Sequence, residues 1–296
     1  MNSFWKNKKA MVTGGSGFIG SFVVDELLKR GAHVSIIAHS LDRERDNIAH
    51  VLEKIDIIEG NLLDEQFVCQ SLHNQDVILH LASYKKNIAF HQKYPADILR
   101  TNTLMNVNIL EAARKNNLQR ILMMSSGIVY GREARVPNTE KDGFLGDVEP
   151  AHFGYAWSKR FSEILTEAYH NQLGMQVAIA RPYNIYGPRD NFDPESAQVV
   201  PTFIRRILNK EDPFVMWGDG NQERSFLYVA DLARGLLDLL EKYPECDPIN
   251  FGTDETIILK DLAKMIMNIE GVNLDIRFDL SKPGGLSKRN CDNKKS

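Results

Sequence analysis

A small group of side chains in the middle of the chain has the types and spacing for acid–base chemistry. Tyr155 and Lys159 are four residues apart, so on a helix they share one face. An ammonium group beside a phenol favours its ionised form, which lets tyrosine exchange protons near neutral pH. Ser125 and Ser126 directly follow an apolar run that predicts a strand. Because open α/β sheets bind ligands at the carboxyl ends of their strands, these side chains are expected at one site.

A second set of residues, near the N-terminus, predicts a dinucleotide site. Gly14, Gly17 and Gly20 form a GxxGxxG pattern between an apolar strand and a helix. Glycine suits this place because the turn is tight, because backbone approaches a pyrophosphate, and because helix and strand pack closely. The free amides and positive end of the helix then hold the phosphates. We therefore expect NAD or NADP to bind here.

The end of the second predicted strand bears on the choice between the two cofactors. A carboxylate at this place binds the ribose hydroxyls of NAD. The chain instead has Ala38, followed by His39, Ser40 and, further on, Arg43. A missing acid with an arginine nearby suits the 2′-phosphate of NADP, although Arg43 also fits a solvated helix start. NADP is favoured over NAD on this basis.

Alternating strands and helices place these residues around one sheet. Short apolar runs predict strands over residues 9–13, 34–38, 55–59, 77–81, 121–124 and 177–181. Helical patterns are expected over residues 21–30, 104–115 and 155–171. Strands that alternate with helices need right-handed crossovers. The expected fold class is α/β, with a Rossmann-type doubly wound parallel sheet.

The pattern changes after residue 181. Prolines separate shorter elements there, and two amphipathic helices are predicted around residues 232–240 and 262–269. We expect an NAD(P)-binding Rossmann domain over residues 1–180. A smaller mixed α/β substrate-binding lobe, interleaved with the first domain, is expected over residues 181–296.

The composition excludes several classes of function. A formal net charge of -3 gives no basic excess for nucleic acid, and no apolar run is long enough for a membrane span. Cys69, Cys246 and Cys291 are far apart, which suits reduced thiols in the cytoplasm. The eight histidines form no HxxxH or HxH pair, so no metal site is predicted. We expect a cytoplasmic protein without nucleic-acid or membrane partners.

With these motifs, the chain resembles the extended short-chain dehydrogenase/reductases, in their nucleotide-sugar epimerase/dehydratase branch. The resemblance runs from about residue 8 to the end, over the blocks GGSGFIG, HLAS, SSGIVYG, YAWSK, RPYNIYGPRDNF and WGDGNQERSFLYVADLA. It implies that Ser126 hydrogen-bonds the reacting sugar oxygen, that Tyr155 moves its proton, and that Lys159 holds the nicotinamide ribose. It also implies a homodimer formed through the helices that follow Asn102 and Ser158.

Matching positions imply the remaining ligand contacts. The resemblance implies that the cofactor is bound by Gly14, Ser16, Gly17, Phe18, Ile19, Gly20, His39, Ser40, Arg43, Asn61, Leu62, Leu81, Ala82, Ser83, Asn102, Ser125, Tyr155, Lys159, Pro182 and Ile185. It implies contacts with the sugar or its nucleotide diphosphate by Lys85, Ser126, Asn184, Arg189, Arg224 and Arg289. The C-terminal lobe is most similar to GDP-mannose 3,5-epimerases and GDP-fucose synthases, so a GDP-sugar is the first expectation.

Departures from the family pattern narrow the reaction. Nucleotide-sugar 4,6-dehydratases carry an acidic pair after the active-site serine or threonine, where this chain has Gly127 and Ile128. The 3,5-epimerases and fucose synthases have a cysteine at the position of Ile128, and the synthases have a histidine at that of Arg189. Dehydration and proton exchange at C3 or C5 are therefore not expected. Hydride transfer at one carbon, with C4 expected, is the chemistry that remains.

Two kinds of enzyme perform this transfer with the same serine, tyrosine and lysine. An epimerase keeps its cofactor, takes a hydride from the sugar and returns it to the other face. A ketoreductase takes NADPH, reduces a 4-keto sugar and releases the oxidised cofactor. The sequence favours the NAD(P)-dependent epimerase by a small margin, although the missing acid after the second strand favours the NADPH-dependent reductase. The family pattern continues beyond Ser296, so a non-catalytic cofactor-binding protein is the alternative from another class.

Overall fold

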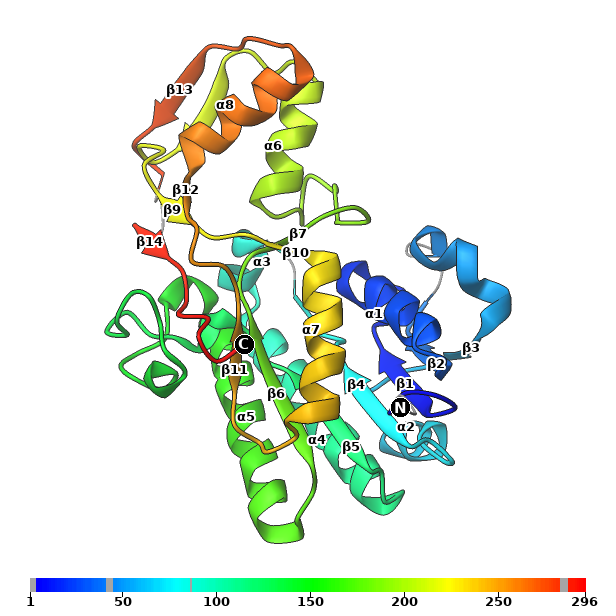
Figure 1. The fold of residues 1–296 in the computed structure, drawn as a ribbon. Helices are drawn as coiled ribbons and strands as arrows, with labels where there is room; N and C mark the ends of the chain where they lie inside the picture. The colour runs from blue at the N-terminus through cyan, green and yellow to red at the C-terminus, as the bar shows by residue number, and fades with distance from the viewer. Residues whose placement is uncertain (1–3, 41–44, 86, 283–286) are drawn as a thin grey trace.

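A seven-stranded parallel sheet forms the centre of the computed structural model, which describes residues 4–40, 45–85, 87–282 and 287–296 (Figure 1). Its strands stand in the order β11-β6-β5-β4-β1-β2-β3. The strands are β1 (Lys9–Thr13), β2 (His33–Ala38), β3 (Ile55–Glu59), β4 (Val77–His80), β5 (Arg120–Met124), β6 (Val177–Pro182) and β11 (Ile249–Phe251). From β1 the chain builds the sheet outward to one side through β2 and β3, and from β4 it builds to the other side through β5 and β6. This is the doubly wound arrangement. The predicted α/β fold class is confirmed.

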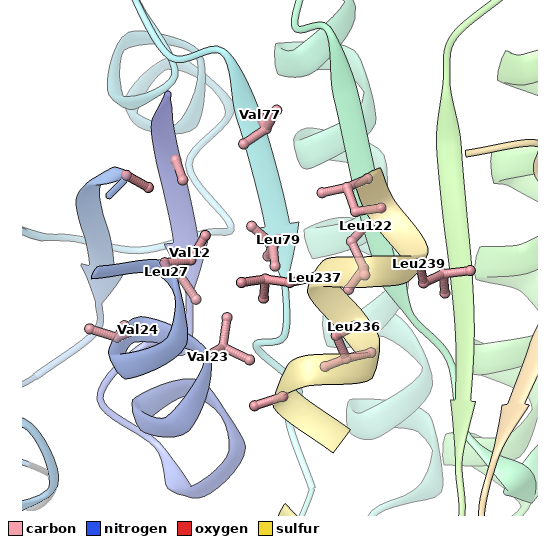
Figure 2. Packing of buried hydrophobic residues seen from close by; sticks show 14 of the residues in the cluster. Val12, Val23, Val24, Leu27, Val77, Leu79, Leu122, Leu236, Leu237 and Leu239 are labelled. Atoms are coloured by element: carbon pink, nitrogen blue, oxygen red, sulfur yellow. The ribbon is translucent and has the colours of Figure 1, made fainter. Parts of the chain in front are cut away.

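Helices cover both faces of this sheet. On one face lie α1 (Phe18–Lys29) and α7 (Val229–Lys242), whose apolar sides meet side chains of the central strands. Figure 2 shows Leu27 of α1 and Leu237 of α7 beside Val12 and Leu79. The other face is covered by α2 (Glu65–Ser71), α4 (Pro95–Lys115) and α5 (Phe153–Leu173). The sheet is thus buried on both faces, which explains its nearly continuous apolar strands.

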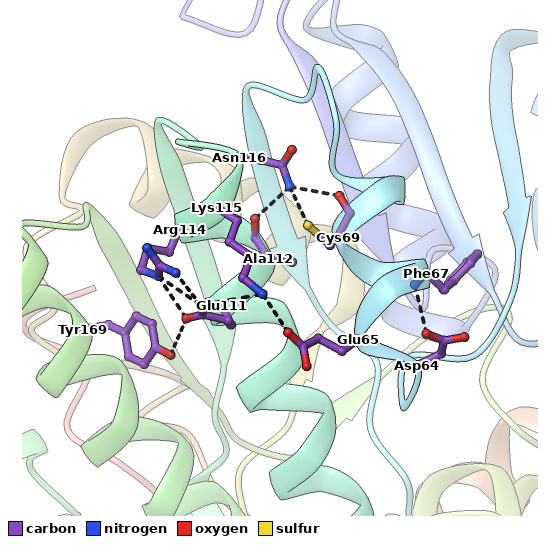
Figure 3. Close-up of polar contacts among 10 residues, drawn as sticks. All are labelled: Asp64, Glu65, Phe67, Cys69, Glu111, Ala112, Arg114, Lys115, Asn116 and Tyr169. Carbon is purple, nitrogen blue, oxygen red and sulfur yellow. Dashed lines mark hydrogen bonds and ion pairs between the residues drawn. The ribbon is translucent and has the colours of Figure 1, made fainter.

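Polar contacts connect the helices of the second face (Figure 3). Tyr169 of α5 donates a hydrogen bond to Glu111 of α4 over 3.0 Å. Lys115 of α4 pairs with Glu65 of α2 at 2.7 Å. The first contact joins α5, which carries the predicted Tyr155–Lys159 pair, to α4, and the second joins α4 to α2.

A smaller lobe stands beyond the carboxyl ends of the strands, at the top of Figure 1. Here α6 (Val199–Leu208) and α8 (Leu259–Glu270) pack on β8 (Phe214–Trp217), which pairs with β13 (Ile276–Asp279). Short strands connect this lobe to the sheet: β7 (Ile185–Tyr186), β9 (Glu223–Arg224), β10 (Leu227–Tyr228), β12 (Ile257–Ile258) and β14 (Lys288–Arg289). Between these segments α7 and β11 return to the large sheet, so the chain crosses from one part to the other several times.

Shorter helices complete the connections: α3 (Ile88–Lys93) and the 3₁₀ helices η1 (Arg45–Lys54), η2 (Gly127–Val129), η3 (Glu140–Asp142) and η4 (Pro150–His152). In the described ranges, no helix has the length and apolar character needed to span a bilayer. Cys69, Cys246 and Cys291 are free thiols. The expected cytoplasmic location stays a prediction.

Candidate active site

A large cleft lies at the carboxyl ends of the sheet strands. Its volume is about 1230 Å³, and its walls come from the ends of β1, β2, β4, β5 and β6 and from the segment between β7 and α6. Single small ligands occupy pockets of about 300–1,000 Å³. The cleft therefore has room for a dinucleotide together with a second ligand.

The glycine turn between β1 and α1 forms one end of the cleft. Gly14 has a left-handed backbone with φ of 69°, and a Cβ atom there would lie 3.1 Å from the backbone of Ala82. A Cβ atom on Gly20 would meet the backbone oxygen of Gly14 at 1.9 Å. Only glycine lets the turn approach α1 this closely, and Gly17 caps the helix N-terminus. This cradle fits the pyrophosphate of a dinucleotide.

The predicted contacts of the adenosine half lie beside this turn. His39 and Ser40 follow β2, and Asn61 and Leu62 follow β3; all four line the cleft. Arg43 lies outside the described residues. Asp190 is the only acidic side chain among the described residues that line the cleft, and it belongs to the segment after β7. Within those residues, no carboxylate stands where the ribose hydroxyls of NAD would be bound.

The acid–base side chains meet at the ends of β5 and α5. Lys159 donates a hydrogen bond to the backbone oxygen of Met124 over 2.6 Å, and its Nζ lies 5.6 Å from the centre of the Tyr155 ring. Tyr155, Lys159, Ser125 and Ser126 all line the cleft. The predicted grouping of serine, tyrosine and lysine therefore exists in the fold.

The surroundings of Tyr155 favour its ionised form. Burial opposes ionisation, but the ammonium groups of Lys159 and Lys85 and hydrogen bonds with Ser83 and Ser126 outweigh it, so the pKa of Tyr155 lies below its ordinary value. Burial also lowers the pKa of Lys159, although the Tyr155 phenol opposes that shift. Tyr155 is thereby prepared to exchange a proton.

A buried network of charged and polar side chains lies next to Ser125 and Lys159. Arg181 of β6 donates two hydrogen bonds to the carboxylate of Glu163 on α5, over 2.9 and 2.5 Å. Glu163 also accepts a hydrogen bond from Ser125, the neighbour of Ser126. Arg181 further donates to Tyr130, whose hydroxyl donates to Asn250 of β11. The network thus connects β5, β6, β11 and α5.

His80 of the HLAS block is packed and does not face a ligand. It hydrogen-bonds Thr13 at 2.8 Å and Asn106 at 3.1 Å. Burial and the nearby charge of Lys159 lower the pKa of His80 to about 3, so the ring is neutral. This agrees with the sequence-based interpretation of His80 as a packing residue.

The loop after β4 carries further predicted contacts. Leu81, Ala82, Ser83 and Lys85 line the cleft. Asn102 of α4, which was predicted to bind the cofactor, lies behind this loop and outside the cleft lining. Its side-chain oxygen accepts hydrogen bonds from Ser83 and from the backbone of Tyr84, and its amide donates to Tyr84 and Ile98. Because these bonds occupy the side chain, the structure gives Asn102 a supporting position.

Two arginines lie side by side where the smaller lobe reaches the cleft. Arg224 of β9 and Arg289 of β14 are partners in the strand register, and Arg289 donates to the backbone oxygen of Gly127 over 2.9 Å. Burial and the like charge of Arg289 lower the pKa of Arg224 to about 10, although Glu149 opposes this. Two partly buried guanidinium groups this close are arranged to bind an anion such as a diphosphate. Arg289 lines the cleft, as does the predicted Asn184, whereas the predicted Arg224 is not among the lining residues.

Comparison with known proteins shows which family the chain belongs to. The model of the NAD dependent epimerase/dehydratase family matches residues 10–252. The chain belongs to this family.

Relatives within the epimerase/dehydratase family span almost the whole chain. The chain is 34% identical to a dTDP-4-dehydro-6-deoxy-D-allose reductase from Streptomyces sp, over 97% of the chain and 89% of the relative. It is 30% identical to a GDP-L-fucose synthase from Sinorhizobium fredii, over 95% and 86% respectively. The structure of UDP-glucose 4-epimerase from Thermotoga maritima superposes with a TM-score of 0.87 at 28% identity, covering 97% of this chain and 90% of that one. The expectation of an enzyme of the NAD(P)-dependent nucleotide-sugar epimerase and reductase family is confirmed.

Arg189, a predicted substrate contact, has its side chain directed away from the cleft. Arg189 has a left-handed backbone with φ of 66° and does not line the cleft. Its guanidinium pairs with Asp25 of α1 at 2.8 Å and lies over the ring of Phe22, 4.5 Å from the ring centre. The prediction that Arg189 contacts the substrate is therefore not supported by its position, which joins the segment after β7 to α1.

The sequence did not reveal several side chains that surround Tyr155. His91 of α3 lies edge-to-face with Tyr155 at 5.4 Å between ring centres, and with His152 at 5.1 Å. His152 pairs with Glu149 at 3.4 Å, and both histidines line the cleft. His152 stands three residues before Tyr155, which was the one local signal available. His91 is distant in sequence, so only the fold brings it here.

Proposed function

We propose that this enzyme is an NADPH-dependent reductase of a 4-keto nucleotide sugar. The observation that carries the proposal is the end of β2, where Ala38, His39 and Ser40 stand and none of these residues is acidic. A carboxylate at this place would repel a 2′-phosphate, so its absence favours NADPH. NADPH that enters reduced and leaves oxidised suits a net reduction. The dTDP-4-dehydro-6-deoxy-D-allose reductases among the relatives support the same reaction.

Each catalytic side chain has one task in this reaction. NADPH, when bound, supplies the hydride. Ser126 donates a hydrogen bond to the keto oxygen, and Tyr155 gives that oxygen its proton as negative charge develops. The ammonium of Lys159 stabilises the tyrosinate that results, because it lowers the pKa of Tyr155. The turn at Gly14 and the N-terminus of α1 hold the pyrophosphate.

The substrate end is defined by the two arginines. Arg224 and Arg289 are proposed to bind the diphosphate, since guanidinium groups donate paired hydrogen bonds to phosphate oxygens. The sugar then extends toward Tyr155, past Lys85 and Asn184. The sequence favours a GDP-sugar, whereas the reductase relatives act on a dTDP-sugar. Both nucleotides therefore belong in the test.

The reductase proposal is tested by following NADPH absorbance with dTDP- and GDP-linked 4-keto-6-deoxy sugars. The Tyr155→Phe variant removes the proton donor, so the turnover rate is expected to fall by about 10²–10⁴-fold. Tyr169→Phe is the matched control, because Tyr169 lies on the same helix but bonds Glu111 outside the cleft. An unchanged rate in Tyr155→Phe would refute the assignment of Tyr155 as the acid.

An epimerase is the second candidate, favoured by the sequence and supported by the likeness to UDP-glucose 4-epimerase. The two differ in what happens to the cofactor. An epimerase keeps its nicotinamide cofactor through the cycle. Freshly purified protein should therefore release nearly one molecule of NAD per protein chain when it is denatured. A reductase should release little and should bind NADPH more tightly than NADH. Retained NAD would overturn the reductase proposal.

A homodimer is proposed on the outer face of α5. Phe153, Trp157, Phe161 and Ile164 recur every three or four residues there and are between 36% and 51% exposed. Such a stripe on one helix face suits a two-fold pairing with a second copy. Trp157→Glu should yield monomers in size-exclusion chromatography with light scattering, whereas Ile269→Glu on α8 should not. A monomeric parent protein would refute the dimer.

A further inference from the structure

The segment between β7 and α6 places a carboxylate in the cleft that no prediction assigned. Arg189 turns the backbone with its left-handed φ of 66° and directs its own side chain to Asp25. The next residue, Asp190, lines the cleft. The arginine thus anchors the segment to α1 and the aspartate faces the ligand space.

One oxygen of the Asp190 carboxylate lacks a donor. Its Oδ1 accepts a hydrogen bond from the backbone N–H of Asn191 over 2.7 Å. Its Oδ2 is buried and has no hydrogen-bond partner among the residues that the structure describes. Burial raises the pKa of Asp190, opposed by the Asn191 amide and by the charge of Lys85. Because a buried acceptor without a donor is costly, a ligand that supplies a donor would be held strongly.

Lys85 provides the opposite charge from the other wall of the cleft. It belongs to the loop after β4, and its Nζ lies 6.0 Å from the centre of the Tyr155 ring. Its charge acts on both Asp190 and Tyr155. Among the described residues, however, no hydrogen bond joins Lys85 to Oδ2 of Asp190. The two charges therefore face a common space beside the reacting tyrosine.

A hydroxyl group fits between such partners, because it donates one hydrogen bond and accepts others. We propose that Asp190 and Lys85 hold one ring hydroxyl of the sugar, which donates to Oδ2 of Asp190 and accepts from Nζ of Lys85. The inference rests on the proposed function and specifies its substrate class: a sugar that carries a free hydroxyl beside the reacting carbonyl. A deoxy sugar at that carbon leaves Oδ2 without its donor and is a poor substrate.

The test crosses a variant of Asp190 with analogues of the substrate. Asp190→Asn keeps the shape of the side chain but removes its charge. It should lower kcat/KM by roughly 10- to 100-fold with the full 4-keto sugar, as for a lost hydrogen bond to a charged group. With the analogue that is deoxy at C3, the carbon beside the C4 carbonyl, the loss should be less than about 3-fold, because the partner is already missing. Asp193→Asn, on the same segment but outside the cleft lining, should change neither value.

A binding measurement separates this inference from the proposed function. Calorimetry gives Kd for the intact nucleotide sugar and for the free nucleoside diphosphate, without turnover. Asp190→Asn should weaken the first by roughly 10-fold or more and leave the second unchanged. Equal loss with both ligands, equal loss with every deoxy analogue, or no loss at all would overturn the role of Asp190. If the parent protein reduces no 4-keto sugar but shows this binding pattern, the reductase proposal falls and the hydroxyl contact stands.

Discussion

The buried pair of Arg181 and Glu163 gives the sharpest test of how the fold supports the site. Their side chains are only 2% and 4% exposed, and two hydrogen bonds join them. Changing Glu163 to Gln keeps the shape but leaves the Arg181 cation buried without its carboxylate. Removing one partner of a buried pair typically costs about 3–5 kcal/mol, since the remaining charge stays desolvated.

This loss of unfolding free energy can be converted into a change in Tm. With 296 residues and about 2.1 cal/mol/K of unfolding entropy per residue, the total entropy is about 0.6 kcal/mol/K. A loss of about 3–5 kcal/mol therefore lowers Tm by about 5–8 °C. The turnover rate should fall as well, because Glu163 accepts a hydrogen bond from Ser125, next to the proposed catalytic Ser126, and its charge favours the ammonium form of Lys159.

Calorimetry and denaturant unfolding of four proteins provide the assay: the parent, Glu163→Gln, Arg181→Met and the double variant. The double variant should lose less free energy of unfolding than the sum of the two single losses, because it buries no unpaired charge. Glu65→Gln is the matched control, since its ion pair with Lys115 is exposed and should matter by at most about 1 kcal/mol. A loss below about 1 kcal/mol in Glu163→Gln, or strict additivity, would refute the reasoning.

Three further predictions test the site and its frame. Lys159→Met removes the charge that lowers the pKa of Tyr155, so in the oxidation direction the rise of rate with pH should move to higher pH; an unmoved profile argues against this coupling. In Glu111, a hydrogen bond from Arg114 outweighs burial and lowers the pKa to about 2, so its stabilisation is present above the ordinary pKa and is lost as pH falls toward 2. Glu111→Gln should therefore cost about 0.3–1 kcal/mol at neutral pH, with the difference vanishing in acid, as measured by urea unfolding. Gly20→Ala places a methyl group against the turn and should weaken NADPH binding by at least about 10-fold in a fluorescence titration. Gly174→Ala also strains a backbone, with φ of 66°, but at the far end of α5 and outside the cleft, so it should leave NADPH binding unchanged.

Six strands of the large sheet were predicted from their apolar runs, whereas β11 was not; of the six, all but the edge strand β3 are largely buried. The apolar runs ending at Thr13 and Glu59 predicted the ends of β1 and β3 correctly. Helix starts were less readable: α4 begins at Pro95, nine residues before the predicted start at Leu104. Its first turns carry polar residues, which dilute the apolar period, and proline at the first helical position was the remaining signal.

The amphipathic segment around residues 232–240 shows a different limit. Its pattern correctly indicated a helix, α7, but an apolar face does not specify what it packs against. The sequence assigned this segment to a substrate-binding lobe interleaved with the first domain, and the structure places Leu236 and Leu237 in one buried cluster with Val12 of the large sheet. Long-range order of this kind depends on the whole topology.

The site divides in the same way. Tyr155 and Lys159 were recognised from a four-residue spacing, and the glycine turn from the seven-residue block at residues 14–20, because both are local. His91 and Asp190 come from segments far from Tyr155 in sequence, so nothing in their neighbourhood revealed them.

This division predicts where catalytic rate and substrate choice reside. Tyr155 and Lys159 stand on a helix that the buried Arg181–Glu163 pair ties to the sheet, so changes in that network should lower kcat and Tm together. Lys85 and Asp190 stand on connecting segments, and their substitutions should alter discrimination between sugars while Tm stays constant. Relatives with one fold and different substrates are expected on this basis, since segments vary without disturbing the sheet. If Asp190→Asn lowered Tm as much as Glu163→Gln does, substrate choice would not be separable from the frame.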